Sequence, residues 1–180
     1  MRILNYSHTI AVSTEQVFDW FKNLDKNYIK WHPATHKYFQ WLTGKPIKKG
    51  AIFRFEEQIE EHTHKMVMKV SEYIENKRLS FSSLRIYHES NYIPHWLLTA
   101  FILFFRIKME MIRSFEEDVK NLTTIHIIHK FGSPLPVIGN LIDWITEHFI
   151  ISSKKHLEHI KEEALNMKSD LENMGKERNP

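Results

Sequence analysis

Apolar and polar residues alternate over much of the chain, and this pattern predicts its strands. Residues 3–12 alternate with a period of two and include β-branched side chains, as is typical of a strand. The same alternation returns at several places between residues 38 and 128. Polar turn signals at residues 44–46, 76–77 and 118–121 separate these stretches. Consecutive strands joined by short polar turns predict an antiparallel sheet.

Two parts of the chain have a helical pattern instead. Ser13 and Gln16 have the spacing of a capping box, so a short helix is predicted to follow the first strand. Residues 25–36 are aromatic and contain Pro33, so we expect an irregular loop there. A second helical pattern covers residues 140–174. A continuous helix of that extent would be roughly 50 Å long, so we expect its end to extend past the body of the domain or to fray.

The order of these elements predicts an α+β fold. A strand and a short helix come first, then an antiparallel sheet, and a long helix comes last. A chain of 180 residues suits a single domain. We place this domain at residues 1–174 and expect the polar residues 175–180 to form a disordered tail.

The composition narrows the chemistry that the chain can perform. It has no cysteine, which excludes disulfides, thiolate zinc fingers and a cysteine nucleophile. Its formal net charge of +3 is too small to indicate nucleic acid as a partner. The 12 histidines are unusual, because histidine is both the commonest metal ligand and the side chain that titrates near neutral pH. The positions of the histidines therefore matter most.

The most apolar stretch is Trp96 to Phe105, within a less regular region at residues 84–105. It is much shorter than the roughly 20 residues that a helix needs to cross a membrane. We therefore expect a buried or lid helix, and a surface contact with a membrane is the alternative. The amino terminus lacks the continuous apolar core of a signal peptide, so we expect a cytoplasmic location.

The long helical pattern contains an unusual stripe. At 100° per residue, six residues fall on one side of it: Leu141, Ile145, His148, Ser152, His159 and Glu163. The stripe is apolar at its start and polar later, although a carboxylate that faces a sheet needs a partner. His159 and Glu163 are four residues apart, so their side chains can converge on one metal ion. The alternative is a surface pair on a charged helix.

Two other places carry candidate ligands. His32 and His36 lie in the aromatic segment 28–41, which is either the wall of a site or a buried aromatic cluster. Glu57 shares one face of a predicted strand with apolar residues, so it needs a partner there unless a shifted register turns Glu56 inward. Two histidines and two carboxylates without a thiolate would suit zinc and, less specifically, manganese or iron.

The element order over residues 3–170 resembles the helix-grip fold of the START-like superfamily, which includes plant pathogenesis-related allergens and polyketide cyclases. In that fold a curved sheet wraps around the long helix and leaves an apolar cavity. Three short motifs are similar to those of the 2,4-diacetylphloroglucinol hydrolase family. They are HIKEEALNM at His159–Met167, WHPATH at Trp31–His36 and, more loosely, FEEQI at Phe55–Ile59. These hydrolases use zinc to cleave a carbon–carbon bond in an acylated phenol.

The resemblance implies roles for six residues. The zinc ligands would be His36, Glu57, His159 and Glu163. Tyr28 would be a phenol that contacts the substrate. His32 is the alternative to His36 as a ligand; with His36 preferred from the motif, His32 would lie outside the ligand shell. His32 and Tyr28 are then the candidates for the general acid that the leaving ring carbon needs.

The resemblance also implies a ligand and a reaction. The substrate would be a small apolar or phenolic molecule, related to polyketides, cut at an acyl–aryl or β-diketone bond. The alternative function is a non-catalytic carrier of a hydrophobic small molecule, which is the commoner use of a helix-grip cavity. The sequence does not decide whether the chain forms a homodimer. Six residues are expected to line the cavity: Phe53, Phe55, Met66, Met68, Met109 and Met111.

Overall fold

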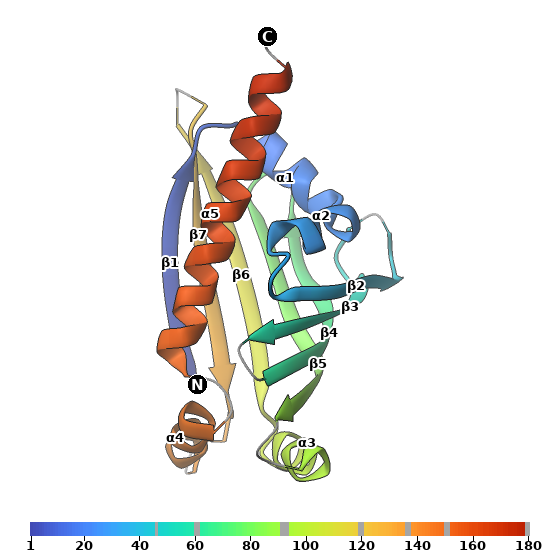
Figure 1. The fold of residues 1–180 in the computed structure, drawn as a ribbon, viewed down its shortest axis with the longest axis vertical. Coiled ribbons are helices and arrows are strands. Elements are labelled where there is room, and N and C mark those ends of the chain that lie inside the picture. The colour runs from blue at the N-terminus through green and yellow to red at the C-terminus, as the bar shows by residue number, and fades with distance from the viewer. Residues whose placement is uncertain are drawn as a thin grey trace.

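A strongly curved antiparallel sheet holds the long carboxy-terminal helix in its concave face (Figure 1). The computed structural model describes residues 1–45, 47–59, 62–90, 94–118, 121–135, 138–149 and 152–178. Within these residues, seven strands form one sheet in the order β1-β7-β6-β5-β4-β3-β2. The strands are β1 (Arg2–Ile10), β2 (His36–Thr43), β3 (Ile52–Ile59), β4 (His62–Ile74), β5 (Arg78–Ser90), β6 (Lys108–Glu117) and β7 (Thr123–Gly132).

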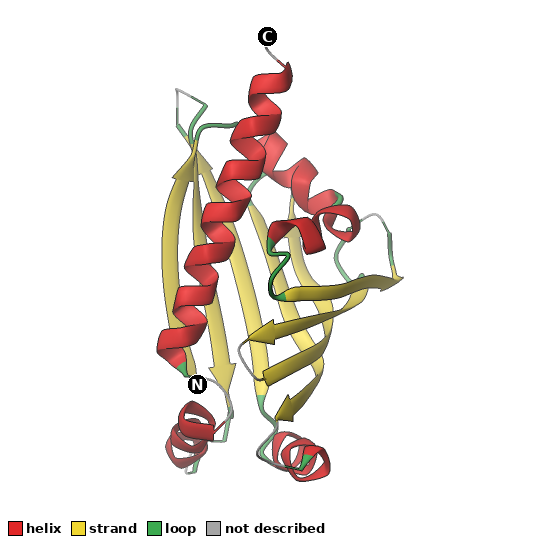
Figure 2. Ribbon diagram, in the orientation of Figure 1, coloured by secondary structure: helices red, strands yellow, loops and turns green. Residues whose placement is uncertain are grey.

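The helices lie on the concave face of the sheet and at its ends (Figure 2). They are α1 (Thr14–Lys22), α2 (Leu24–Trp31), α3 (His95–Phe104), α4 (Gly139–Phe149) and α5 (Ser153–Arg178). The capping box predicted at Ser13 and Gln16 is present at the start of α1. The α+β helix-grip architecture expected from the element order is thus confirmed.

The period-two pattern correctly marks the strands. In β1, even-numbered residues face inward and odd-numbered ones are exposed. In β3, Phe53, Phe55 and Glu57 are buried together. Strand β1 pairs with β7, so the first strand joins the last one and only β1 and β2 are sheet edges among the described residues. Local periodicity gives the strands, but this pairing joins segments about 120 residues apart.

The expected loop at residues 25–36 is wrong for its first part, because Leu24–Trp31 form α2. Pro33 does not prevent this helix but follows its end, where a proline disfavours helical backbone in the residue before it. The less regular region after residue 84 is also more ordered than expected, since β5 continues to Ser90. The aromatic segment therefore reaches the sheet as a helix, a short turn and then β2.

The single helix expected at residues 140–174 is in fact two. Helix α4 ends at Phe149 and α5 begins at Ser153, and α4 crosses the foot of the molecule rather than continuing α5 (Figure 1). The sequence between them is rich in β-branched and serine residues, which are poor in a helix interior. Leu141 is 60% exposed, so the stripe drawn through it and His159 does not exist.

Helix α5 nevertheless has a buried face. Its 26 residues span about 39 Å, and Ile160, Ala164, Met167 and Leu171 are buried against the sheet at helical spacing. His156, His159 and Glu163 belong to that same buried face. The helix continues to Arg178, into the expected tail, and residues 179–180 lie outside the described residues. Burying three polar side chains on one helix face is unfavourable unless they have partners, so these residues are candidates for a site.

Helix α3 contains the apolar run and is only partly buried. Leu98 and Ile102 pack inward, whereas Trp96 and Phe104 are 71% and 77% exposed. Among the described residues, no helix is both long enough and apolar enough to cross a membrane. The expectation of a buried or lid helix thus holds for one face of α3.

Candidate metal centre

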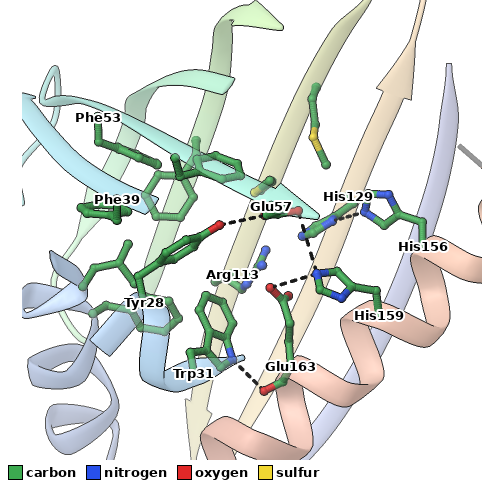
Figure 3. Close-up of a pocket in the computed structure, with 16 residues that line it drawn as sticks. Tyr28, Trp31, Phe39, Phe53, Glu57, Arg113, His129, His156, His159 and Glu163 are labelled. Atoms are coloured by element: carbon green, nitrogen blue, oxygen red, sulfur yellow. Dashed lines mark hydrogen bonds and ion pairs between the residues drawn. The ribbon is translucent and has the colours of Figure 1, made fainter. Parts of the chain in front are cut away.

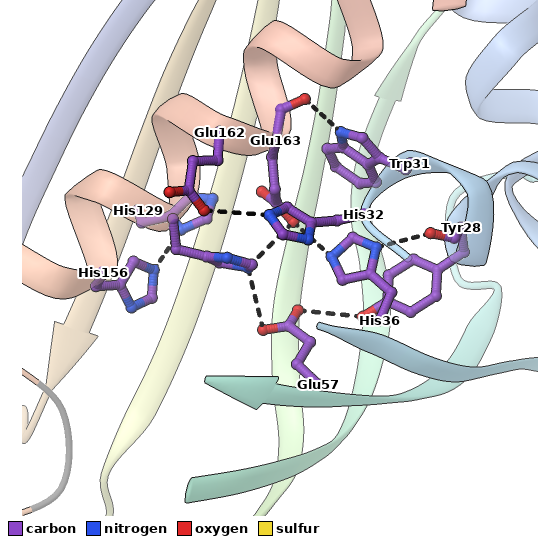
Figure 4. A network of polar contacts seen from close by, with 10 residues as sticks. Tyr28, Trp31, His32, His36, Glu57, His129, His156, Glu162 and Glu163 are labelled. Atoms are coloured by element: carbon purple, nitrogen blue, oxygen red, sulfur yellow. Dashed lines mark hydrogen bonds and ion pairs between the residues drawn. The ribbon is translucent and has the colours of Figure 1, made fainter. Parts of the chain in front are cut away.

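Four polar side chains from three elements converge between the concave face of the sheet and α5 (Figure 4). His36 begins β2, and Glu57 is its cross-strand partner on β3. His159 and Glu163 come from α5, one helical turn apart. Each of the four offers a ligand atom within 4.8 Å of the others. The structure therefore brings together all four residues that the resemblance indicated as ligands.

The four side chains are buried and in contact. His36 Nε2 lies 2.8 Å from Glu163 Oε1, and His159 Nε2 lies 3.5 Å from the same oxygen. Glu57 Oε2 is 3.9 Å from His159 Nε2. His159 and Glu163 are only 6% and 5% exposed, so a solvated surface pair is ruled out. Buried imidazoles and carboxylates at these distances have the arrangement of a metal site without its ion or of a hydrogen-bonded cluster.

The turn after α2 orients His36. Its Nδ1–H donates to the Tyr28 carbonyl at 2.7 Å, and its backbone N–H donates to the His32 carbonyl at 2.8 Å. The Tyr28 ring stacks on the imidazole, with centroids 4.0 Å apart and planes 4° from parallel. This bond fixes the ring with Nε2 toward the site, where Nε2 donates to Glu163 in the metal-free protein and would bind a metal ion once deprotonated.

Helix α2 also holds α5 in place. The Trp31 Nε1–H donates to the backbone carbonyl of Glu163 at 2.7 Å. Tyr28 and Trp31 lie one turn apart on α2, so the same short helix contacts His36 and Glu163 (Figure 4). The Tyr28 hydroxyl donates to Glu57 Oε1 at 3.2 Å. Three of the four candidate ligands thus have a partner on α2.

The charges of the four groups are strongly interdependent. Burial opposes ionisation of Glu163, but the charge of His159, 3.5 Å away, and the hydrogen bond from His36 hold its pKa well below the usual range. Burial raises the pKa of Glu57, and the negative charge of Glu163 adds to the increase. Burial disfavours protonation of His159, but Glu163 and Glu57 outweigh it and raise its pKa to about 9. In the metal-free protein, protons supply the positive charge that the carboxylates need.

A divalent cation can replace those protons. Two carboxylates and two neutral imidazoles together carry the charge of −2 that a divalent ion balances, and such donors suit zinc. Among the described residues, His159 Nε2 is buried without a hydrogen bond, a nitrogen that an ion would satisfy. The residues present therefore fit a metal ion.

His32 and Glu56 are the two alternatives that the sequence left open. His32 Nε2 lies 3.2 Å from Glu162 Oε2, and the two form a second group of possible ligands with His159. That group includes the exposed Glu162, so the wholly buried set with His36 is the better site. Glu56 turns away from the site and its carboxylate is 4.0 Å from Lys65. The register assumed for Glu57 is therefore correct.

Glu57, His159 and Glu163 of this cluster line one wall of an internal pocket (Figure 3). Four of the six expected lining residues line it, namely Phe53, Phe55, Met109 and Met111. Met66 instead lines a neighbouring cavity, and Met68 is fully buried in the core. The polar lining includes Arg113, His129 and His156, none of which the sequence reasoning singled out.

Arg113 is the most unusual of these residues. It is 3% exposed, and among the described residues its Nε and Nη1 have no hydrogen-bond partner. Burial lowers its pKa to about 10, against the attraction of Glu163 and Glu57. A buried cation with unused N–H donors beside an apolar pocket is chemically suited to an anionic group. Its inward position in the alternating pattern of β6 was the signal that could have found it.

His129 and His156 form a neutral pair next to His159. Their Nδ1 and Nε2 atoms are 2.9 Å apart, and both rings are buried. Burial lowers both pKa values, that of His156 to about 4. At neutral pH this pair therefore offers hydrogen bonds to the pocket without adding charge.

Comparison with known proteins gives the fold. No family model matches the chain. No curated protein matches it either. A START superfamily protein from Mycobacterium smegmatis has a similar structure, with 15% identity, a TM-score of 0.65, and 96% of this chain and 98% of that chain covered. The major latex-like protein 151 of Panax ginseng has 10% identity, a TM-score of 0.64, and coverage of 94% and 96%.

A truncated norcoclaurine synthase from Thalictrum flavum is similar to the same extent. It has 10% identity and a TM-score of 0.63, with 93% of this chain and 91% of that chain covered. At such identities the likeness establishes the START-like helix-grip fold and leaves the function to be argued from the site.

Proposed function

We propose that this protein is a metal-dependent hydrolase that cleaves a carbon–carbon bond in a small phenolic or polyketide-like substrate. Zinc is the ion that we propose, and the bond is of the acyl–aryl or β-diketone type. The observation that carries the proposal is the convergence of His36, Glu57, His159 and Glu163, all buried, at the wall of an apolar pocket. The resemblance to 2,4-diacetylphloroglucinol hydrolases supports it, because its three motifs supply these four residues.

The pocket suits a flat apolar ligand with one acidic group. Aromatic and methionine side chains cover most of its lining, while Arg113 offers two free N–H donors. Met109 and Met111 are the lining side chains that can best adapt their shape to such a ligand.

A metal ion held by the four residues would polarise an acyl oxygen and lower the pKa of nearby water. Water adds to the acyl carbon of the ring-ketonised substrate, and the carbon–carbon bond breaks with its electrons on the ring carbon. Arg113 is placed to stabilise the enolate oxygen that then forms. The ring carbon takes a proton, which restores the aromatic ring, and the acyl group leaves as a carboxylic acid.

The proton for the ring carbon must come from a side chain in the site. Burial and the charges of Glu57 and Glu163 raise the pKa of Tyr28 well above its usual value, so its hydroxyl stays protonated. His32 lies beside His159, with ring centroids 5.1 Å apart, and its Nε2 contacts the exposed carboxylate of Glu162. Tyr28 can therefore orient the substrate, and His32 can exchange protons with solvent through Glu162.

Metal analysis of two neighbouring variants tests the proposal. His159→Ala should remove one equivalent of zinc from the purified protein, as measured by mass spectrometry, because it deletes a buried ligand. Glu162→Ala, on the exposed side of the same turn, should retain that zinc. Adding zinc to the metal-free wild type should also raise its melting temperature, since a ligand of the folded state stabilises it. Retention of all zinc by His159→Ala, or no binding by the wild type, would contradict the proposal.

A non-catalytic carrier is the second candidate function. The largely apolar lining of the pocket favours it, since such a lining binds hydrophobic molecules without any reaction. Incubation of the zinc-loaded protein with an acylated phloroglucinol separates the two functions. Release of the free acid and the deacylated phenol supports the hydrolase, whereas binding without turnover supports the carrier.

Three further expectations stay predictions: a cytoplasmic location, a homodimer, and contact with a membrane through Trp96 to Phe105. The last has some support, because α3 exposes large apolar side chains at one end of the molecule (Figure 1).

A further inference from the structure

Three histidines lie together on β4 and β5, next to α3, and one of them, His64, is the cross-strand neighbour of Glu57. His62 and His64 are two residues apart, so both face the same side of β4. His88 on β5 is the cross-strand partner of His64. A His-x-His pair on one strand and a histidine opposite it place three imidazoles on one patch of the sheet.

The geometry of the three rings is close to that of a metal site. His64 Nδ1 and His88 Nδ1 are 3.1 Å apart. The ring centroids are 4.5 Å apart for His64 and His88, 4.9 Å for His62 and His88, and 6.5 Å for His62 and His64. Three imidazoles around one tetrahedral zinc, at about 2.1 Å from each nitrogen, have centroids roughly 5 Å apart. The ligand nitrogens of the three rings are not yet all within reach of one ion, so His62, which is partly exposed, has to move inward.

Each ring has a nitrogen that nothing satisfies. Among the described residues, His62 Nδ1, His64 Nε2 and His88 Nε2 are buried without a hydrogen bond. His64 is 6% exposed and His88 is fully buried. The Nδ1 atoms of His64 and His88 already face each other, so an ion between them would take the place of their hydrogen bond and would also satisfy His62 Nδ1. The two Nε2 atoms are not the proposed ligands. His95 of α3 supports the cluster from outside, since its Nδ1–H donates to the His88 carbonyl at 3.3 Å.

We propose that His62, His64 and His88 bind a second transition-metal ion through three neutral imidazoles. Such a set favours zinc, copper or nickel over magnesium or calcium, because imidazole is a nitrogen ligand and no carboxylate belongs to the triad. His64 and His88 also line a small cavity bounded by Glu57 and His156, so a fourth position faces the interior. The two sites share no ligand, and this inference does not rest on the proposed function.

Zinc titration of the metal-free full-length protein tests the proposal. Calorimetry and mass spectrometry should give two zinc ions per wild-type chain. His64→Ala and His88→Ala should each bind one, with the affinity for the lost ion reduced more than roughly 100-fold, since loss of a mere outer partner already reduces affinity 10- to 100-fold. His126→Ala, on the other face of β7, is the matched control and should bind two. His159→Ala should also bind one, the ion on the triad.

Anomalous diffraction at the zinc edge keeps the test decisive if the alanine variants unfold, because it locates the ions in the wild type. Density at the triad supports the proposal, even if the site with His159 is empty, in which case the hydrolase proposal fails alone. A single ion that only His159→Ala removes would overturn the second site and leave the hydrolase intact. No bound zinc at all would overturn both.

Discussion

At the scale of single residues, the site is built from groups that are unfavourable on their own. Glu57 is a carboxylate on the apolar face of a strand, and burial raises its pKa. Arg113 is a buried cation with unused donors. Neither side chain is explained by a contribution to the stability of the fold, because a buried charge without a full set of partners is destabilising. Both are explained if an ion and an anionic ligand complete the site.

Arg113→Met separates function from stability at this scale. The free energy of unfolding of the variant should be higher than that of the wild type by roughly 1–2 kcal/mol, because an unpaired buried charge is replaced by an apolar side chain of similar length. The KM for a phenolic substrate should rise, since the anion contact is lost. Denaturant unfolding and steady-state kinetics measure the two effects.

The control for this variant is Arg54→Met, which removes an exposed arginine that contacts the ring of Tyr38. It should change stability by less than about 0.5 kcal/mol and leave KM unchanged. An Arg113→Met protein that is less stable, with an unaltered KM, would show that the guanidinium has a structural role.

Tyr28→Phe examines the phenol next to Glu57. The ring and its stacking on His36 remain, but the hydroxyl that donates to Glu57 is removed. We expect one equivalent of zinc to stay bound to the four ligands and kcat to fall roughly 100-fold, within the usual contribution of a positioned acid or donor. Tyr38→Phe, at an exposed hydroxyl bonded to Gln40, is the control. An unchanged kcat in Tyr28→Phe would remove Tyr28 from the mechanism.

At the scale of elements, α2 and α5 matter most for the site. Helix α2 contacts His36, Glu57 and Glu163 through Tyr28 and Trp31. Helix α5 places His159 and Glu163 one turn apart on its buried face. Because the four candidate ligands lie on two strands and a helix, the backbone hydrogen bonds of these elements fix their positions.

Helix α3 supports a prediction of its own. If it contacts membranes, the wild type should float with vesicles, and the Trp96→Asp, Phe104→Asp double variant should stay in the pellet fraction. The reason is that aromatic side chains on an interfacial helix bury their area in the lipid boundary, and a carboxylate cannot. Leu84→Asp, at an exposed apolar residue outside α3, should float like the wild type. A wild type that fails to float would end this idea.

At the scale of the whole molecule, buried histidines make stability depend on pH. His8 on β1 is largely shielded from solvent, and both of its nitrogens lack a hydrogen bond among the described residues. Burial, with the charges of Arg113 and Lys168, lowers its pKa from 6.5 to about 4. Between these values the unfolded chain binds more protons than the folded one, so acidification favours unfolding.

His8→Gln should reduce this pH dependence. The contribution is absent above about pH 6.5 and grows as the pH falls to 4, so the variant should lose about 1 kcal/mol less than the wild type between pH 7 and 5. Tyr6→Phe, which changes the ring stacked on His8, should keep the wild-type slope. Unfolding in denaturant at several pH values measures the slopes. Equal slopes in His8→Gln and the wild type would contradict the role of His8.

The chain's periodicity and motifs determined the fold class and the candidate ligands. Alternation at period two follows from backbone geometry alone, so it marks β1 and β3 without tertiary information. The spacing of His159 and Glu163 fixes their convergence for the same reason. The break between α4 and α5 was missed because the helical spacing of apolar residues continues through it, although the residues between the two helices are poor helix formers.

The tertiary structure alone decided which distant residues meet. The pairing of β2 with β3 sets His36 opposite Glu57, and the curvature of the sheet brings both to α5. Arg113, His129 and His88 carried no local motif that linked them to their neighbours, and the His-x-His spacing of His62 and His64 did not show that His88 lies opposite. Their neighbours come from strand register and helix docking, which are set by the burial of the whole apolar face rather than by any short stretch of sequence.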